Sequence, residues 1–412
     1  MGLWNSLPGR SEGGPDYSQY CLDELMDARD HTDREKYPER AQKLDDLIAR
    51  STATEATEEL PDLSLRFDGS AREYFRIWIV NLCLTILTLG IFSAWAKVRK
   101  KRYSYSRTTL GDTPFQYLGR PVPILKGRVI AAVGFLMYYI SSHYVTYLMP
   151  YVPGAGLIVA PWVIVRSAAF NARYSAFRNM TFHFEGTYLG AMKMLYAWGI
   201  VPAFVLGMMF NWPGKPIVFA VTSIILSFSF PWLIRRLKGF IIEHTSYGGK
   251  KGIFFATGGQ FFKIYLVAGL ISMAAAIPFF VLISLFAFLK QSRFPAYIGV
   301  APVYAGYVLM FAYIQSRSGN LVWNHTRLGP LRFRSTLRWG GLIKLYVMNA
   351  LGIIVSLGLL IPWAVMRTVK YRIDHMEVIP EGGLGEFQGS DASAVTAVGA
   401  EMIDFFDVDL SL

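Results

Sequence analysis

The stretch TLGIFSAWAKVRKKRYSY, residues 88–105, joins an apolar run that contains a glycine and a tryptophan to a row of cations. Tryptophan prefers the head-group layer of a bilayer, and lysine or arginine can extend its charge into water from the same depth. The basic end of this segment is therefore expected at a membrane surface. Whether the apolar part crosses the membrane, or enters and returns, depends on the conformation of Gly90.

The composition predicts a protein that spans a membrane several times. Its 412 residues are 53% hydrophobic and 15% aromatic, and the mean hydropathy is +0.33, which is too apolar for ordinary soluble domains. Several apolar runs approach or reach the roughly 20 residues that cross the hydrocarbon layer. The runs are Val129–Met149, Met194–Asn211, Ile217–Ile234, Ile264–Leu289, Ala296–Ile314 and a shorter Tyr151–Val165 broken by Pro161. We therefore expect a membrane all-α fold, a polytopic helical bundle.

The net charge of +12 is distributed unevenly along the chain. Residues 1–66 hold 8 Lys/Arg and 15 Asp/Glu, residues 367–412 hold 3 and 9, and residues 67–366 hold 30 and 5. The central cations stand at the ends of the apolar runs, where the positive-inside rule places them in the cytoplasm against anionic head groups. The pattern predicts anionic membrane lipids as partners and argues against nucleic acid. A homo-oligomer is compatible with it.

The charge pattern also divides the chain into three parts. We expect an acidic cytoplasmic tail, partly helical or disordered, over 1–66, a repeated transmembrane body over 67–378 and an acidic disordered tail over 379–412. In the first tail, Leu44, Leu47 and Ile48 stand at helical spacing, which fits a solvated helix or a weak docking face. The first thirty residues have no pattern of a removable signal peptide, so this tail is expected in the cytoplasm.

An internal repeat links the two ends of the body. At an offset of 268 residues, an ungapped match pairs Asn81 with Asn349 and Gly90 with Gly358. Weaker copies between them begin with a cation and an aromatic residue and end with Trp-x-x-x-Arg, which is typical of helical hairpins anchored at one interface. The anchor residues are Trp95, Arg99, Trp162, Arg166, Trp232, Arg236, Trp363 and Arg367.

Gly90 and Gly358 leave two interpretations of the first and last units open. Each segment is long enough to cross once, and glycine packs readily between membrane helices. Alternatively, each segment is a re-entrant hairpin that turns at the glycine, which neighbouring helices must cover. The first interpretation gives eight crossings and exports both acidic tails, whereas the second gives six crossings and keeps both tails in the cytoplasm. Export of a charged tail of 66 residues without a signal is difficult, which favours the second.

A second pattern follows the Trp-x-x-x-Arg endings. Arg107, His244 and His325 each stand four residues before a glycine, and His375 occupies the same place in the last unit. The flanks alternate polar and aromatic residues around Gly-Asp or Gly-Pro, which predicts small cytoplasmic β-elements beneath the bilayer. If these elements gather around one axis, the four side chains converge on an anion or lipid head group, and binding strengthens below neutral pH. Otherwise they only hydrogen-bond loops at the lipid surface.

These residues resemble the YjgN family of bacterial inner-membrane proteins. The resemblance rests on Phe67-Asp-Gly69, Asn81, the run from Thr88 to Arg99, Tyr103 and Thr108–Gly111. It covers residues 65–378 and leaves both acidic tails outside. The family implies a multi-pass inner-membrane location and this architecture, and it supplies no catalytic residues.

The sequence favours a protein that is not an enzyme. The patterns G-x-S-x-G, H-E-x-x-H, the P-loop and G-x-G-x-x-G are missing, and no cofactor or metal-ligand set is recognised. Transport or facilitation of an anionic or amphipathic solute is the first expectation, although no predicted span contains Asp or Glu. The alternative is a membrane scaffold or sensor that binds a cytoplasmic partner or anionic lipid. Asn81 and Asn349 are intramembrane polar positions that also fit simple interhelical hydrogen bonding.

Overall fold

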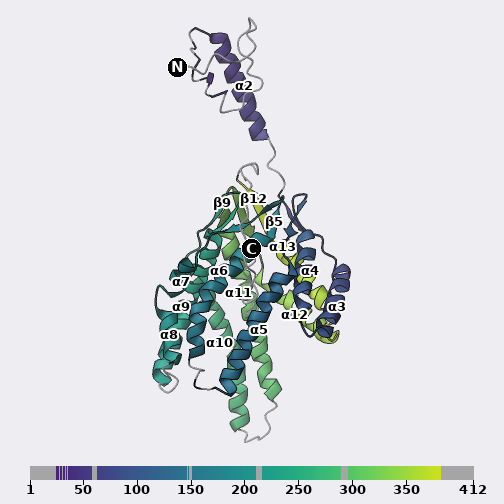
Figure 1. The fold of residues 1–412 in the computed structure, drawn as a ribbon, viewed down its shortest axis with the longest axis vertical. Helices are drawn as coiled ribbons and strands as arrows, with labels where there is room; N and C mark the ends of the chain where they lie inside the picture. Colours follow the sequence, from purple (N-terminus) through teal and green to yellow (C-terminus); the bar gives the residue numbers. More distant parts are fainter. Residues whose placement is uncertain are drawn as a thin grey trace. The chain divides into compact units, whose positions relative to one another are not determined.

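The computed structural model divides the chain into two compact parts, Met1–Asp62 and Leu63–Leu412. It describes residues 25–57 except 27, 30, 33 and 35, and residues 63–381 except 146, 148–150, 210–215 and 289–295. The apolar helices belong to the second part, which Figure 1 shows together with its strands.

In the N-terminal part, helix α2 spans Pro38–Thr57. Leu44 is fully buried against Leu25, and Leu47 and Ile48 pack on this small core. The apolar face expected from the spacing is therefore present, and residues of the same part cover it.

The second part consists of five successive hairpin units, each made of a strand, a helical hairpin and another strand. Unit 1 contains β1 (Leu65–Phe67), α3 (Ala71–Leu87), α4 (Ser93–Ser106) and β2 (Thr108–Leu110); unit 2 contains β4 (Gln116–Tyr117), α5 (Pro121–His143), α6 (Val152–Tyr174) and β5 (Ser175–Phe177). Unit 3 contains β7 (His183–Phe184), α7 (Tyr188–Tyr196), α8 (Ile200–Met209), α9 (Pro216–Glu243) and β8 (Thr245–Tyr247). Unit 4 contains β9 (Lys250–Phe254), α10 (Gly258–Phe288), α11 (Ala296–Asn324) and β10 (Thr326–Leu328); unit 5 contains β11 (Leu331–Ser335), α12 (Trp339–Val355), α13 (Ile361–Ile373) and β12 (Met376–Pro380). The short strands β3 (Thr113–Pro114) and β6 (Met180–Thr181) lead into β4 and β7.

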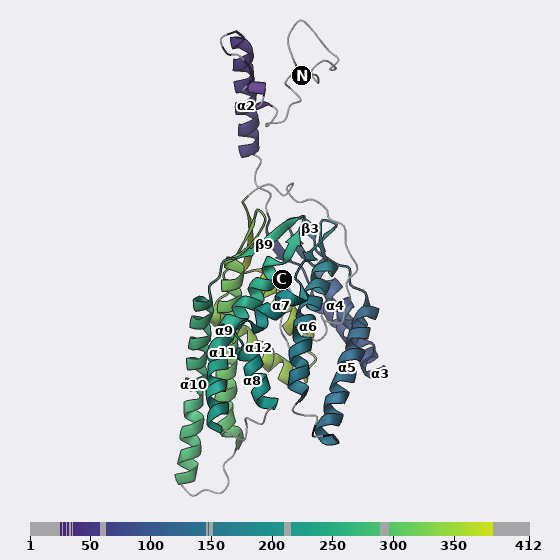
Figure 2. The same cartoon turned by 60° about the vertical axis from the view of Figure 1, so that its left-hand side comes forward.

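Hydrogen bonds arrange these strands into three sheets, with the orders β1-β2-β3, β4-β5-β6 and β12-β11-β10-β9-β8-β7, which together form one layer. In every unit the first strand pairs antiparallel with the last, as β1 does with β2 and β11 with β12. The last strand then turns tightly into the strand that follows it. β12 lies beside β1, so the first and last units are neighbours. Figures 1 and 2 show the strands gathered at one end of the helices, which confirms the predicted β-elements.

One residue from the last strand of each unit joins a single apolar cluster. These residues stand three to five positions after the end of the second helix and are Leu110, Phe177, Tyr247, Leu328 and Val378. The hydroxyl of Tyr247 donates to the carbonyl oxygen of Phe177 at 2.9 Å. Because every unit contributes to the cluster, it lies at the centre of the β layer. Side chains therefore fill this centre and fix the ends of the hairpins relative to one another.

We call the helix or helices before the turn of a hairpin its first arm and the helix after it the second arm; in unit 3 the first arm is α7 and α8. The helices form a ring, in which the second arm of each hairpin packs against the first arm of the next. α4 packs on α5, α6 on α7, α9 on α10 and α11 on α12, and α13 closes the ring on α3. Small residues and prolines at one equivalent position of the second arms are buried in these interfaces, where they allow close approach. They are Ala94, Pro161, Pro231, Ala312 and Pro362.

Four helices of the described chain are long and apolar enough to cross a membrane, which confirms a membrane helical fold. They are Pro121–His143, Gly154–Tyr174, Pro216–Glu243 and Gly258–Leu285. The span predicted over Met194–Asn211 is wrong as one helix, because Gly199 adopts a φ of 67° and separates α7 from α8. Asn211 lies outside the described residues.

Pro161 does not end a helix, contrary to the prediction of a short span broken at this residue. α6 continues through it to Tyr174. A proline inside a helix deprives the carbonyl four residues earlier of its usual donor, and here that carbonyl belongs to Leu157. The hydroxyl of Tyr196 on α7 donates to this oxygen at 2.6 Å. The neighbouring helix thus supplies the missing hydrogen bond, and α6 continues.

The glycines of the first and last units lie in turns and not in helix contacts. Gly90 has a φ of 91° and Gly358 a φ of 92°. Their amides donate to the carbonyl oxygens of Thr85 at 2.7 Å and Ile353 at 2.8 Å. A Cβ added to Gly90 would meet no atom within 4 Å, so close helix packing does not explain this residue. The chain therefore turns at both glycines, as the hairpin interpretation requires, and both ends of each segment return to the β layer. The expected cover by neighbouring helices is missing among the described residues, since Leu89 and Leu357 beside the glycines are exposed, and insertion of these hairpins in the membrane stays a prediction.

Candidate lipid-binding surface

The second arm of every unit ends at one equivalent residue, whose carbonyl is tied to the first strand of the same unit. These residues are Arg107, Tyr174, His244, His325 and His375, and each carbonyl oxygen accepts an amide hydrogen bond of 2.9 Å. The donors are Asp68, Leu118, Glu185, Phe255 and Thr336. The predicted shared position of four of these residues is therefore confirmed. Unit 2 was missed because it has Tyr174 instead of histidine and Arg178, with a φ of 46°, instead of the turn glycine.

The side chains at this position cap the helices that carry them. Nδ1 of His244, His325 and His375 lies 2.8, 2.9 and 2.9 Å from the carbonyl oxygen four residues earlier. Arg107 instead pairs with Glu73 at 2.8 Å. Each group thus bonds within its own unit, and no contact among the described residues joins one to another. Convergence of these four side chains on a common anion stays a prediction.

A cation on the first arm recurs in all five units. It stands nine residues after the final position of the first strand, and it is exposed in every unit. The residues immediately around it in the helix face the neighbouring hairpin, as Ile124 does for Lys126. This position is occupied by Arg76, Lys126, Lys193, Lys263 and Lys344.

An arginine on the second arm recurs as well, eight residues before the end of that arm. The set comprises Arg99, Arg166, Arg236, Arg317 and Arg367. Four of the five were predicted from Trp-x-x-x-Arg, whereas Arg317 was missed because Tyr313 takes the place of tryptophan. Arg317 lies over the ring of Tyr313 at 6.0 Å, and Arg367 lies over Trp363 at 5.0 Å. The anchors thus combine a cation with an aromatic face, the arrangement expected at the head-group level.

The ten recurring cations have no carboxylate partner in the described part of the chain. Among the described residues, the ion pairs of the body lie in the β layer, as between Glu185 and Lys251 at 2.6 Å, or at helix ends, as between Glu73 and Arg107. A positive charge that lies beside an apolar surface and has no carboxylate partner attracts anions from solution or from the membrane. The helices therefore present one band of uncompensated positive charge next to the β layer.

Asn81 and Asn349 hold the two arms of their hairpins together. Both side chains are buried. Nη1 of Arg99 donates to Oδ1 of Asn81 at 3.4 Å, and Nδ2 of Asn349 donates to Oγ1 of Thr368 at 3.1 Å. Both bonds join the first arm to the second, so the interhelical role expected of these asparagines is confirmed.

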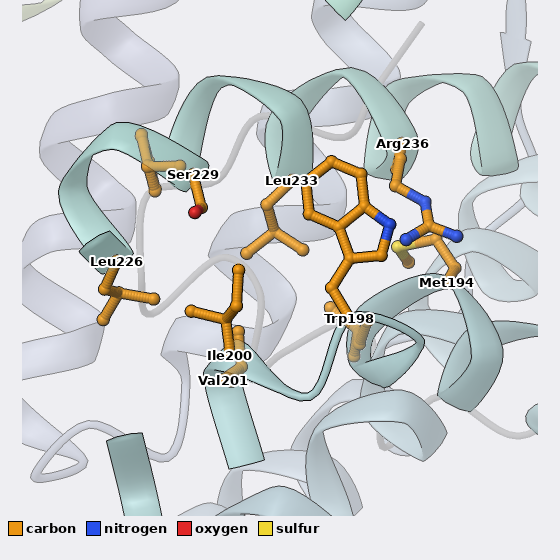
Figure 3. Close-up of a pocket in the computed structure, with 10 residues that line it drawn as sticks. Met194, Trp198, Ile200, Val201, Leu226, Ser229, Leu233 and Arg236 are labelled. Carbon is orange, nitrogen blue, oxygen red and sulfur yellow. The ribbon is translucent and has the colours of Figure 1, made fainter. Parts of the chain in front are cut away.

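A narrow apolar slot opens beside one of the recurring arginines, Arg236. The slot lies between α7, α8 and α9 and has a volume of about 20 Å³, room for little more than one water molecule. Figure 3 shows Arg236 and Trp198 at one end and the side chains of Ile200, Leu226 and Leu233 along it. The guanidinium lies 5.4 Å from the centre of the Trp198 ring. The slot lies where the first arm is interrupted at Gly199, between α7 and α8. The slot is too narrow for an acyl chain as it stands, and its main chemical feature is the cation of Arg236 beside an apolar lining.

Comparison with known proteins agrees with this location. Residues of the chain match the inner membrane protein YjgN of Salmonella typhimurium at 28% identity over 138 residues, which is 32% of this chain and 34% of that protein. The protein of the same name from Escherichia coli K12 is 35% identical over 81 residues, 20% of this chain and 19% of its own length. The chain thus spans about a third or less of these relatives. No solved structure matches it.

The family comparison covers most of the body. The model of a family described as "Bacterial protein of unknown function (DUF898)" matches residues 62–405. This range contains all five hairpin units and leaves α2 outside. The four long apolar helices and the inner-membrane relatives place the protein in the bacterial inner membrane. The chain therefore belongs to the DUF898 family and is a YjgN-like protein of that membrane.

Proposed function

We propose that the protein binds anionic lipids in the leaflet next to its β layer and has no enzymatic activity. The recurring pair of cations carries this proposal. Five units of different length and sequence keep a cation on the first arm and an arginine on the second. An ion-pairing role would require carboxylates within the protein, and the ten side chains have no carboxylate partner among the described residues. Phosphate groups of lipids are the anions available at this depth.

The magnitude of the attraction supports a role for the whole set. A lysine or arginine near an anionic leaflet contributes about 1 kcal/mol, and this contribution falls within a Debye length. Several such cations around one ring therefore retain a shell of anionic lipid even though each interaction is weak. Salt should weaken retention at exposed cations such as Lys263 more than at Arg236, which is half-buried beside the slot.

The same cations define the topology that goes with this function. At about 1.5 Å per residue, α10 extends about 37 Å beyond Lys263, and α9 extends about 30 Å before Arg236. Both lengths match the roughly 30 Å hydrocarbon layer. We therefore assign crossings to the hairpins of units 3 and 4, and also to unit 2, whose two helices are long and apolar enough to cross. Units 1 and 5 are assigned half-depth insertion. Six crossings place the β layer and both chain ends on the cytoplasmic side, in accord with the excess of cations there.

Lipid binding can be measured on purified protein in nanodiscs of phosphatidylglycerol or phosphatidylcholine. Native mass spectrometry should detect phosphatidylglycerol retained by the wild type, and fewer such molecules on the variant Lys263→Gln, Arg317→Gln. Lys251→Gln is the matched control, because Lys251 pairs with Glu185 in the β layer. Equal retention of the two lipids by the wild type would contradict the proposed function.

Transport of an anionic or amphipathic solute is the second candidate. The observation in its favour is the interrupted first arm of unit 3, since broken helices form substrate sites in transporters. The filled centre of the β layer argues against a passage along the ring axis. Proteoliposomes with a fluorescent anionic lipid in the inner leaflet would test this function. Movement of the label that exceeds empty vesicles and is lost in Arg236→Gln would support transport.

A further inference from the structure

We propose that the hairpins of units 1 and 5 form one wedge that inserts into the leaflet next to the β layer and stops near the bilayer centre. The wedge would displace acyl chains in that leaflet only. This role concerns the shape of the membrane and does not depend on the charge of its lipids.

The depth of both hairpins follows from the cations at their bases. Arg76 and Lys344 each stand twelve residues before the turn that begins at Thr88 or Ser356. Twelve helical residues extend about 18 Å, roughly half of a 30 Å hydrocarbon layer with its interface. In Figures 1 and 2, α3 and α12 end closer to the β layer than α10 does. The two turns therefore lie well short of the far interface.

The chemistry of the turns fits acyl chains. Leu89 is 94% exposed and Leu357 is 93% exposed, and Leu87 and Val355 beside them are 78% and 83% exposed. Water around such a turn would be unfavourable, whereas hydrocarbon is favourable at about 25 cal/mol for each square ångström of apolar surface. The occupant of this surface is therefore the acyl region of the lipids.

The backbone of the turns is prepared for a medium without water. The first backbone amides of the second arm have no acceptor within their own helix and need another partner, since an unpaired polar group in hydrocarbon is costly. Oγ1 of Thr88 accepts the amide hydrogen of Phe92 at 2.9 Å, and Oγ of Ser356 accepts that of Leu360 at 3.0 Å. The two turns use the same internal bonds at equivalent positions, so each remains closed in lipid.

The two short hairpins lie side by side because the ring closes between them. Tyr74 on α3 and Met366 on α13 are buried in one cluster, and Trp78 and Val365 pack against it. The half-depth insertions therefore act at one place on the protein. Beneath them, the opposite leaflet contains lipid alone, whereas units 2, 3 and 4 occupy both leaflets. The protein thus adds more area to the leaflet next to the β layer.

Depth-dependent quenching tests the insertion. The variants Leu89→Cys and Leu357→Cys, made with Cys21→Ser and Cys83→Ser, would carry an environment-sensitive fluorophore. Lipids with a nitroxide near the chain end should quench both labels most strongly. A label at Phe280→Cys on α10, about 26 Å beyond Lys263, should be quenched most by nitroxides near the far interface. Strongest quenching of the Leu89 label by head-group nitroxides, from either leaflet, would overturn the wedge.

A second measurement tests the added area. Wild-type protein in neutral phosphatidylcholine should be enriched in small vesicles over large ones when the β layer faces outward. The reason is that the ratio of outer-leaflet to inner-leaflet area is larger in a small vesicle than in a large one. Neutral lipid separates this test from the proposed lipid binding, which requires anionic head groups. Equal density in both vesicle sizes, with quenching as expected, would show half-depth hairpins without a membrane-shaping effect and would overturn that part of the proposal.

Discussion

The hydroxyl of Tyr196 donates to the carbonyl oxygen of Leu157 at 2.6 Å, and Leu157 stands four residues before Pro161. This bond replaces the one that the proline cannot form. Tyr196→Phe should therefore destabilise the protein by about 0.6–1.7 kcal/mol, the range for hydrogen bonds between membrane helices. Unfolding in a mixed detergent titration measures the change. Tyr188→Phe, which removes a bond of 3.0 Å to the oxygen of Ile158 at an exposed tyrosine, is the control with the smaller expected effect.

Replacement of the turn glycines should destabilise the protein because of their positive φ, and not because a side chain would meet neighbouring atoms. Gly90→Leu and Gly358→Leu each force a side chain into the left-handed region, at a cost of about 1–2 kcal/mol. Thermal unfolding in detergent should show similar losses in both variants. Gly134→Leu in α5 is the matched control, because this helical glycine also has no neighbour within 4 Å of an added Cβ. A loss in Gly134→Leu as large as in the turn variants would contradict the backbone explanation.

Arg236 should bind lipid head groups through its charge and through its position beside the ring of Trp198. Arg236→Gln removes the cation and should lower the affinity for phosphatidylglycerol about fivefold, corresponding to about 1 kcal/mol near an anionic surface. Arg236→Lys keeps the charge but only part of the stacking on Trp198, so its affinity should lie between those of the wild type and Arg236→Gln. Native mass spectrometry with increasing salt distinguishes the three proteins. Equal affinity in all of them would show that Arg236 takes no part in lipid binding.

Tyr247 should make the β layer sensitive to alkali. Burial raises the pKa of its hydroxyl, and the nearby Arg178 opposes this effect. The folded protein therefore favours the neutral phenol, whose stabilising contribution is complete below the unfolded value of about 10 and is lost as the pH rises through the higher folded value. Tyr247→Phe should lower stability by about 1 kcal/mol at pH 8, and its difference from the wild type should shrink above pH 10. A constant difference would argue against ionisation of this group.

The order of hairpins and strands was largely readable from the sequence where the repeats keep the same residue types. The match between Gly90 and Gly358 located the two turns, and the arginines after tryptophan located four of five second arms. Units 2 and 4 were recognised incompletely because the fold requires a positive φ in the turn and an aromatic ring beside the arginine, and more than one residue type can supply each. Arg178 adopts the positive φ that glycine has elsewhere, and Tyr313 supplies the aromatic face of a tryptophan.

The choice between crossing and returning could not be made from length alone. An apolar segment of one span-length satisfies both, and only the backbone at Leu89 and Gly90, with φ of 49° and 91°, makes the chain return. The ring itself also escaped prediction. Its closure depends on packing between Tyr74 and Met366, which are almost 300 residues apart and belong to no shared motif.

Closure of the ring through α13 and α3 imposes an order in time as well as in space. A ribosome that adds roughly 5–20 residues per second needs some 15–60 s to make the chain between the first hairpin and the last. During that interval Tyr74 has no partner helix, and the outer edge of β1 has no β12 beside it. The first hairpin must therefore wait in the membrane with one face covered by lipid or by an insertion factor. Synthesis of the final hairpin unit completes the body, and chains released before it should be the preferred substrates of membrane proteases.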